Sequence, residues 1–169
     1  MTRIVCWFSC GAASAVATKL MIAENAGRLP LAIVYTEVAE EHPDNRRFLA
    51  DCEQWFGHPI TIIRNEKYSG SIYEVFRMER FLVGPSGAAC TRLLKRGMRA
   101  SFEQPDDIQV FGYTAEEEER ASGFFERNPS VNGRSPLIER GLGKADCLAM
   151  IEDAGIDIPA MYKLGYRNN

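Results

Sequence analysis

Residues 4–16 read IVCWFSCGAASAV, and this stretch decides the fold. It opens with a continuous apolar run, Ile4 to Phe8, which is typical of a short strand buried on both faces. Small residues follow, and residues 15–26 are then rich in alanine and predict a helix that ends at Gly27. A buried strand that leads through a tight turn into a helix is the first half of a βαβ unit. The stretch therefore favours an α/β fold with a parallel sheet.

The rest of the chain repeats this alternation. We expect three more buried strands, at residues 31–35, 60–63 and 108–111, and five more helices, at residues 42–56, 71–80, 90–102, 116–127 and 144–154. Residues 84–87 are predicted to form a turn and residues 128–136 a loop, and residues 161–166 hold a short apolar segment. Ligands bind beyond the carboxyl ends of parallel strands. The functional surface should therefore lie in the loops after Phe8, Tyr35, Ile63 and Phe111.

Composition and charge narrow the class of protein. The 169 residues are 46% hydrophobic and 25% charged, and we expect one domain over residues 1–169. A formal net charge of −3 argues against a general nucleic-acid binder. No apolar run in the sequence approaches the roughly 20 residues that span a bilayer, and the first residues read as the start of a strand instead of a signal peptide. The cysteines are scattered and odd in number, so we expect a reducing, cytoplasmic location without a disulfide framework; they are Cys6, Cys10, Cys52, Cys90 and Cys147.

The turn after the first strand consists of small residues: Ser9, Cys10, Gly11, Ala12, Ala13 and Ser14. Such a turn lets the backbone approach a ligand closely, and the free N–H groups at the start of the next helix favour an anion such as phosphate. From the residues alone, tight helix–strand packing with a serine N-cap explains the turn equally well. A helix N-terminus lowers the pKa of a thiol, so Cys10 is expected to be the most reactive cysteine; a small residue that simply fits is the alternative.

The turn resembles the PP-loop of the adenine nucleotide α-hydrolase superfamily, whose usual form is Ser-Gly-Gly-x-Asp-Ser. Ser9, Gly11 and Ser14 match the first serine, the second glycine and the last serine. Cys10 stands at the first glycine, and Ala13 stands at the aspartate, which weakens the case for a conventional ATP pyrophosphatase. Over nearly its whole length the chain resembles small phage and bacterial proteins of the phosphoadenosine phosphosulfate (PAPS) reductase-like family. The resemblance implies a three-layer, Rossmann-like fold with a mostly parallel sheet of about five strands.

The resemblance also implies where the base of a nucleotide lies. In relatives the backbone at the end of the second strand lies near the adenine, which corresponds here to Val34, Tyr35 and Thr36. Glu37 and His42 follow this strand and are weaker site candidates. The proline and aspartate after His42 are explained better by helix initiation than by a site.

A cationic stripe follows the predicted turn at residues 84–87. Arg92, Lys95, Arg96 and Arg99 are three or four residues apart and would share one helix face, which could neutralise a sulfate, a phosphate or a nucleic-acid backbone. A solvated helix face is the alternative. In sulfonucleotide reductases a cysteine followed by a lysine in this region contacts the anionic substrate or an iron–sulfur cluster, a pattern that Cys90 and Lys95 match loosely. The candidate anion or substrate contacts here are Cys90, Thr91, Arg92 and Lys95.

The fourth strand leads into a segment that resembles the family's Gly-x-Arg-x-x-Glu motif, which closes with an arginine and helps to hold phosphates. Gly112 and Tyr113 are expected beside the nucleotide, where Gly112 would let a ligand pass over the strand end. Glu117 and Arg120 are expected beside its anion. Thr114 stands where an arginine is usual, so one cationic contact is missing. Residues 116–119 are four glutamates, which are more typical of a solvated helix turn than of metal ligands, and we expect no metal held by protein side chains.

The implied ligand is an adenine nucleotide, ATP or PAPS, with Cys10, Lys95 and Arg120 as the catalytic candidates. With ATP the chemistry would be attack on the α-phosphate with pyrophosphate leaving, which needs Mg²⁺. With PAPS it would be sulfonyl transfer to a thiol, and a thiol donor such as thioredoxin is the expected partner. Reductases of this kind carry a C-terminal nucleophilic cysteine, but no cysteine follows Cys147. Either the sequence continues beyond Asn169 or the thiol step is lacking, and an iron–sulfur cluster is not expected.

Two other functions stay open. One is an ATP-dependent sulfur transferase acting on RNA, with the cationic stripe against the RNA backbone. The other is a non-catalytic module that binds a nucleotide or a protein partner, which Ala13, Thr114 and the missing terminal cysteine favour. The sequence also leaves the oligomeric state open, including a homo-oligomer.

Overall fold

The computed structural model describes residues 1–85 and 87–169. Its centre is a five-stranded sheet with the order β3-β2-β1-β6-β7, in which every neighbouring pair runs parallel. The strands are β1 (Ile4–Phe8), β2 (Leu31–Thr36), β3 (Ile60–Ile63), β6 (Ile108–Val110) and β7 (Asn132–Arg134). The parallel α/β sheet and the four strands predicted from the sequence are confirmed.

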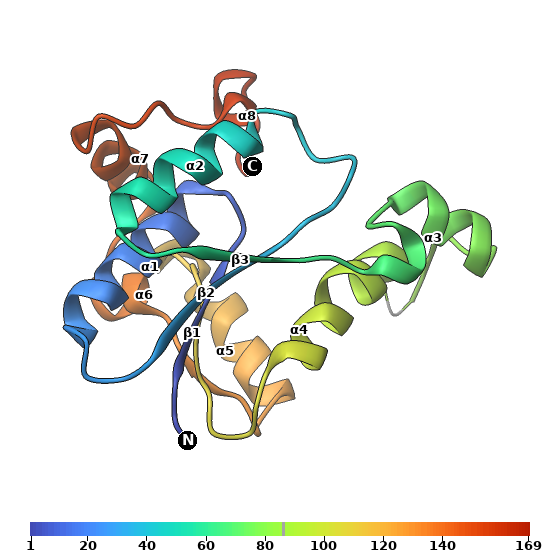
Figure 1. Ribbon diagram of the computed structural model, residues 1–169, viewed down its shortest axis with the longest axis horizontal. Helices are drawn as coiled ribbons and strands as arrows, with labels where there is room; N and C mark the ends of the chain where they lie inside the picture. Colours follow the sequence, from blue (N-terminus) through green and yellow to red (C-terminus); the bar gives the residue numbers. More distant parts are fainter. Residues whose placement is uncertain (86) are drawn as a thin grey trace.

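Helices cover both faces of the sheet, so the architecture is the predicted three-layer, Rossmann-like one (Figure 1). One face carries α1 (Ala12–Asn25), α2 (Asn45–Phe56) and α7 (Lys144–Asp153), and the other carries α4 (Gly97–Phe102) and α5 (Glu118–Arg127). Shorter elements complete the chain: α3 (Ile72–Glu79), α6 (Pro136–Glu139), α8 (Ala160–Lys163), 3-10 turns at Glu66–Tyr68 and Ala115–Glu117, and π-helical turns at Thr91–Arg96. Among the described residues, none of these helices combines the length and apolarity needed to cross a membrane.

The core is built around β1 and α1. β1 lies between β2 and β6, and Val5 and Cys6 within it have no exposed surface. The buried face of α1 is made largely of alanines and Val16, and these small side chains let the helix approach the sheet and α7 closely. α1 begins at Ala12, three residues earlier than predicted, so Ser14 belongs to its first turn.

The direction in which the chain adds strands reverses between β1 and β6. From β1 the chain adds β2 and β3 on one side, and from β6 it adds β7 on the other. At such a switch point the loops after the two central strands go to opposite faces of the sheet and leave a crevice at the carboxyl edge. Here these are the loop of small residues after Phe8 and the segment after Phe111.

Two segments differ from the sequence prediction. The predicted loop at residues 128–136 is wrong in part, because Asn132–Arg134 forms β7 beside β6 and Pro136 begins α6. Gly133 meets the ring of Phe125, where a Cβ atom would lie only 2.0 Å from Cε1. This strand therefore depends on the close packing of α5 against Gly133 and not on residues of high β propensity. The predicted turn at residues 84–87 includes Ser86, which lies outside the described residues; the flanking β4 (Val83–Gly84) and β5 (Gly87–Ala88) pair antiparallel.

Candidate functional site

The loop between β1 and α1, residues 9–14, is closed by hydrogen bonds between its own ends. The N–H of Ser9 donates to Ser14 Oγ (3.0 Å), and Ser14 Oγ donates to the carbonyl of Gly11 (3.0 Å). The two serine hydroxyls are 3.1 Å apart, so Ser9 is the donor of that pair. Both hydroxyl protons are therefore used inside the loop. The donors that remain for a ligand are backbone amides in the first turn of α1, which have no acceptor within the helix.

Cys10 occupies a backbone conformation that favours glycine, with a φ of 57°. Its side chain is fully buried, and the thiol donates to the carbonyl oxygen of Asn45 at 3.8 Å. Burial, together with the negative charge of Glu41, raises the pKa of Cys10 to about 12. The prediction of a reactive thiol with a lowered pKa is therefore wrong. The helix begins after this residue, but the side chain enters the core, where desolvation outweighs the helix dipole.

Gly112 holds the end of β6 directly against the loop. A Cβ atom at this position would lie 2.6 Å from both the N and the Cα atoms of Ser14 and 3.0 Å from the carbonyl carbon of Ala13. Gly112 was predicted to make room for a ligand at the end of the strand. The close neighbour is instead the backbone of α1, so this glycine sets the position of the loop relative to β6.

A cavity of about 390 Å³, which we call the loop cavity, opens at the carboxyl ends of β1 and β6. Predicted site residues that line it are Ser9, Gly11, Ala13, Ser14, Gly112, Tyr113, Glu117 and Arg120. The prediction missed six further lining residues: Trp7, Phe111, Lys144, Tyr162, Asn168 and Asn169. The last four come from the C-terminal third of the chain and follow no strand, so the rule about strand ends could not find them.

Two cations reach the loop cavity. Arg120 pairs with Glu117 one helical turn away (2.5 Å), and its guanidinium lies 5.5 Å from the centre of the Tyr113 ring. Lys144 is the first residue of α7, and its ammonium donates to the carbonyl of Arg167 and to Asn168 Oδ1. Thr114, where the resemblance expects an arginine, is buried and caps the turn that precedes α5. Positive charge at the cavity therefore comes from Arg120 and Lys144.

The C-terminal segment lies over the loop. The hydroxyl of Tyr162 accepts the N–H of Ala12 at 3.1 Å, and the carboxamide of Asn169 donates to Cys10 O (2.5 Å) and to Asn45 Oδ1 (2.8 Å). One amide of the first turn of α1 is thus already bonded to a side chain. In the sequence the segment was visible only as a short apolar stretch.

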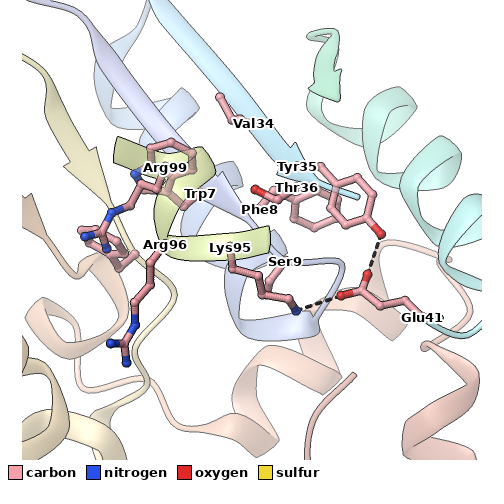
Figure 2. Close-up of a pocket in the computed structure, with 11 residues that line it drawn as sticks. Trp7, Phe8, Ser9, Val34, Tyr35, Thr36, Glu41, Lys95, Arg96 and Arg99 are labelled. Carbon is pink, nitrogen blue, oxygen red and sulfur yellow. Dashed lines mark hydrogen bonds and ion pairs between the residues drawn. The ribbon is translucent and has the colours of Figure 1, made fainter. Parts of the chain in front are cut away.

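A second cavity, of about 190 Å³, lies at the carboxyl ends of β1 and β2, and we call it the strand-end cavity (Figure 2). Predicted site residues that line it are Ser9, Val34, Tyr35, Thr36 and Lys95. The other lining residues are Trp7, Phe8, Glu41, Arg96, Arg99 and Phe111. Its walls are mainly aromatic and aliphatic, and it shares Trp7, Ser9 and Phe111 with the loop cavity.

Glu41 accepts hydrogen bonds from three side chains at one side of the strand-end cavity. Its Oε1 accepts from Lys95 Nζ at 2.8 Å, and its Oε2 accepts from the Tyr35 hydroxyl at 2.6 Å (Figure 2). The same Oε2 also accepts from Asn45 Nδ2 at 3.2 Å. Burial and the hydrogen bond to Glu41 raise the pKa of Tyr35 well above its ordinary value, so its hydroxyl stays protonated. Glu37 and His42, the weaker candidates predicted near Glu41, both line a third cavity. Glu37 pairs with Arg64 (3.4 Å), and His42 Nδ1 accepts the N–H of Asp44 (3.1 Å) at the start of α2.

The predicted cationic stripe divides because its first part is π-helical. Lys95, Arg96 and Arg99 line the strand-end cavity, whereas Thr91 and Arg92 are exposed and line neither cavity. Cys90 packs against a small second core that includes Val75 and Leu94. A π-helical turn holds more residues than an α-helical turn, so the spacing of three and four residues no longer places all four cations on one face. The predicted contacts at Cys90, Thr91 and Arg92 are therefore not brought to the site.

The donor set does not fit a metal ion held by protein side chains. Within the part of the chain that the structure describes, no group of three or more His, Cys, Asp or Glu side chains is arranged as ligands. Glu117 is the acidic residue of the loop cavity and is already paired with Arg120. Mg²⁺ is commonly held by carboxylates together with substrate phosphates. Any Mg²⁺ used here would depend mainly on the phosphates that it accompanies.

The fold of this chain is also found in a known enzyme. No protein-family model matches the sequence, and no curated protein matches it. The structure is similar to a crystal structure of phosphoadenylyl-sulfate (PAPS) reductase from Candida auris in complex with phosphate, with a TM-score of 0.67 and 15% sequence identity. The match covers 98% of this chain and 79% of that chain. At this identity the likeness shows the fold alone, and that fold is PAPS reductase-like.

Proposed function

We propose that this protein binds an adenine nucleotide across its two neighbouring cavities. The base would lie in the strand-end cavity and the phosphate or phosphosulfate group in the loop cavity. The observation that carries the proposal is that Trp7, Ser9 and Phe111 line both cavities, at the switch point of the sheet. The strand-end cavity combines aromatic and aliphatic walls with Lys95, Arg96 and Arg99, and the loop cavity combines backbone amides with Arg120 and Lys144, so a base and an anionic group could be held side by side.

The strand-end cavity suits a purine. Trp7, Phe8 and Phe111 provide aromatic surface, and the end of β2 provides backbone groups that can hydrogen-bond the edge of a base. The indole N–H of Trp7 is fixed by Gln109 Oε1 at 3.0 Å, which holds the ring in place beside the cavity. A rigid aromatic wall lowers the entropy lost on binding.

The loop cavity suits the anionic part of the ligand. The amides of Ala13 and Ser14 lie in the first turn of α1, where the helix dipole favours negative charge. Arg120 and Lys144 supply cations from two other elements. The similar reductase was solved as a phosphate complex, which supports an anion as the ligand of this fold.

Cations beside the base favour PAPS over ATP. Lys95, Arg96 and Arg99 line the strand-end cavity, and among the described residues Arg96 has no ion-pair partner within 4.0 Å. PAPS carries a phosphate on its ribose as well as a phosphosulfate, so it would place negative charge near both cavities. Sulfonyl transfer from PAPS would also need a thiol. None of the five cysteines lines either cavity, so that thiol would come from outside residues 1–169, for example from a thioredoxin-like donor.

A binding module without turnover is the second candidate. Of the three predicted catalytic side chains, Cys10 is buried, Lys95 is paired with Glu41 and Arg120 is paired with Glu117. Ligand binding with no conversion of PAPS or ATP, measured with and without a reduced thiol donor, would favour this candidate.

The ligand is tested by thermal unfolding and calorimetric titration with ATP, AMP, adenosine phosphosulfate and PAPS. A ligand that binds only the native state raises the unfolding midpoint. We expect PAPS to give the largest rise in the unfolding midpoint. We expect Arg120→Ala to weaken PAPS binding by about 3–10-fold. This is less than the roughly 1.5–3 kcal/mol of a full hydrogen bond to a charged group, because Arg120 also pairs with Glu117.

Arg127→Ala is the matched control, because Arg127 lies on the same helix and lines neither cavity. It should bind PAPS as the unchanged protein does. Absence of any shift with all four nucleotides would contradict the proposed function, and a shift that both arginine variants reduce equally would contradict the placement of the anion.

A further inference from the structure

Tyr162 is held firmly at the mouth of the loop cavity. The N–H of Ala160, at the start of α8, donates to Asp44 Oδ2 at 2.8 Å, and Arg47 donates to the carbonyls of Asp157 and Ile158. These bonds attach the segment before Tyr162 to the start of α2. The ring of Tyr162 packs against the main core, so its hydroxyl has a defined position against the loop.

The partner of this hydroxyl determines which way its proton points. A backbone N–H can only donate, so in the 3.1 Å bond with Ala12 the oxygen of Tyr162 is the acceptor. The hydroxyl proton is then directed away from the Ala12 amide. Tyr162 lines the loop cavity, and none of the described residues accepts this proton in a hydrogen bond. Burial raises the pKa of Tyr162, so the hydroxyl is protonated at neutral pH.

We propose that Tyr162 is a positioning residue of the loop cavity, whose hydroxyl donates a hydrogen bond to an oxygen of the bound phosphate or sulfate. This inference rests on the proposed function. The Ala12 amide polarises the hydroxyl and so strengthens it as a donor. The Ala12 amide therefore acts on the anion through Tyr162, in addition to the Ala13 and Ser14 amides of the same turn.

The opposite role would be that of a plug. If the hydroxyl only satisfies the Ala12 amide when no ligand is bound, an anion would have to displace it. Removal of the hydroxyl would then leave anion binding unchanged or make it tighter. The two roles therefore predict changes of opposite sign.

The first test compares Tyr162→Phe with the unchanged protein by calorimetric titration with pyrophosphate, PAPS and adenosine. We expect about tenfold weaker binding of pyrophosphate and PAPS, because one hydrogen bond to a charged group is lost. Adenosine binding should not change. Tyr166→Phe is the matched control, because Tyr166 is exposed and lines neither cavity. Unchanged or tighter binding of pyrophosphate by Tyr162→Phe would overturn the inference. Failure of the unchanged protein to bind pyrophosphate and PAPS would instead overturn the proposed function.

A second variant separates donation from a structural role. Incorporation of 3-fluorotyrosine at position 162 makes the hydroxyl more acidic, hence a better donor and a poorer acceptor. At a pH where the fluorophenol is still protonated, donation to the anion predicts tighter pyrophosphate binding. A hydroxyl that only holds the loop in place by accepting the Ala12 N–H predicts weaker or equal binding, and either of these results would overturn the inference. A plug would also be displaced more easily here and give tighter binding, so the plug is told apart by Tyr162→Phe, for which it predicts unchanged or tighter binding.

Discussion

At position 10 the loop combines a left-handed backbone with a buried thiol. A residue with a Cβ atom in this conformation costs roughly 1–2 kcal/mol relative to glycine. The side chain of Cys10 is fully buried among the core residues, and that burial offsets the cost. At the position where the resemblance expects a glycine, this chain thus has a residue that anchors the loop in the core, and burial suppresses the reactivity of its thiol.

The contact between Gly112 and Ser14 predicts a large effect from a single methyl group. In Gly112→Ala the new Cβ atom would lie 2.6 Å from the backbone of Ser14, which cannot move without the loop or the end of β6. We expect the free energy of unfolding to fall by about 1–3 kcal/mol, as for other overpacked sites, and PAPS binding to weaken. Urea unfolding and calorimetric titration measure the two effects.

Gly123→Ala is the control for this prediction. It makes the same chemical change inside α5, where the new Cβ atom meets only the flexible end of Arg127. Alanine is the better helix former by about 1 kcal/mol, so this variant should be as stable as the unchanged protein or more so. Equal stability of Gly112→Ala and Gly123→Ala would show that the close contact does not constrain the loop.

Some residues that line the cavities could be predicted from the sequence, and others could not. Ser9, Gly11, Ser14, Val34 and Lys95 could be predicted, because the loop motif and the strand ends are local in sequence. Tyr162 and Lys144 could not, because their place depends on the path of the last 30 or so residues over α1 and α2. Glu41 lay within a segment already considered, but only the fold shows that it faces Lys95.

At the scale of elements, the link between α2 and α8 depends on one carboxylate. Asp44 accepts from Arg47 and from the backbone N–H of Ala160. The hydrogen bond from Arg47 is the main cause that lowers the pKa of Asp44 from 3.8 to about 2. A carboxylate whose pKa is lowered by folding stabilises the protein above its unfolded pKa, and this stabilisation is lost as the pH falls through the folded value.

Asp44→Asn should therefore lower the free energy of unfolding by about 1–2 kcal/mol at pH 7. The difference from the unchanged protein should shrink as the pH falls from about 4 to about 2. Urea unfolding at several pH values measures it. Asp51→Asn serves as the control, because Asp51 also pairs with Arg47 but does not bond α8. A difference that stays constant down to pH 2 would contradict this role of Asp44.

Elements were predicted well where their signals are local, and less well where packing decides. The strands β1, β2, β3 and β6 are apolar runs and could be recognised as such. β7 has the sequence Asn132-Gly133-Arg134 and becomes a strand only because β6 offers a free edge beside it. The π-helical turns at Thr91–Arg96 lie in a segment predicted as α-helix, so the cationic side chains were assigned α-helical spacing there.

At the scale of the whole molecule, the two cavities predict a pattern of protection from hydrogen exchange. Binding of PAPS should slow the exchange of amides in the first turn of α1, in residues 112–117 and at the start of α7. The projecting α3, together with β4 on the following segment, forms neither cavity wall and should not change (Figure 1). Exchange measured by mass spectrometry with and without PAPS tests this, and protection confined to α3 would place the ligand elsewhere.

The parallel α/β class followed from the alternation of strands and helices, whereas the strand order β3-β2-β1-β6-β7 was not predicted. The same alternation predicted that the functional surface lies at the carboxyl edge of the sheet, and both cavities open at this edge. The position of α8 and the last residues over this edge could not be predicted in this way, because rules of strand order say nothing about a segment that follows the last strand.

A ligand that binds Lys144 would have to replace hydrogen bonds that this residue already makes. Its ammonium donates to the carbonyl of Arg167 and to the amide oxygen of Asn168. In the proposed complex, a phosphate that took over this ammonium would set both oxygens free and so loosen the hold of Lys144 on residues 167–168. Binding in the loop cavity would thereby also change the contacts of residues 167–168.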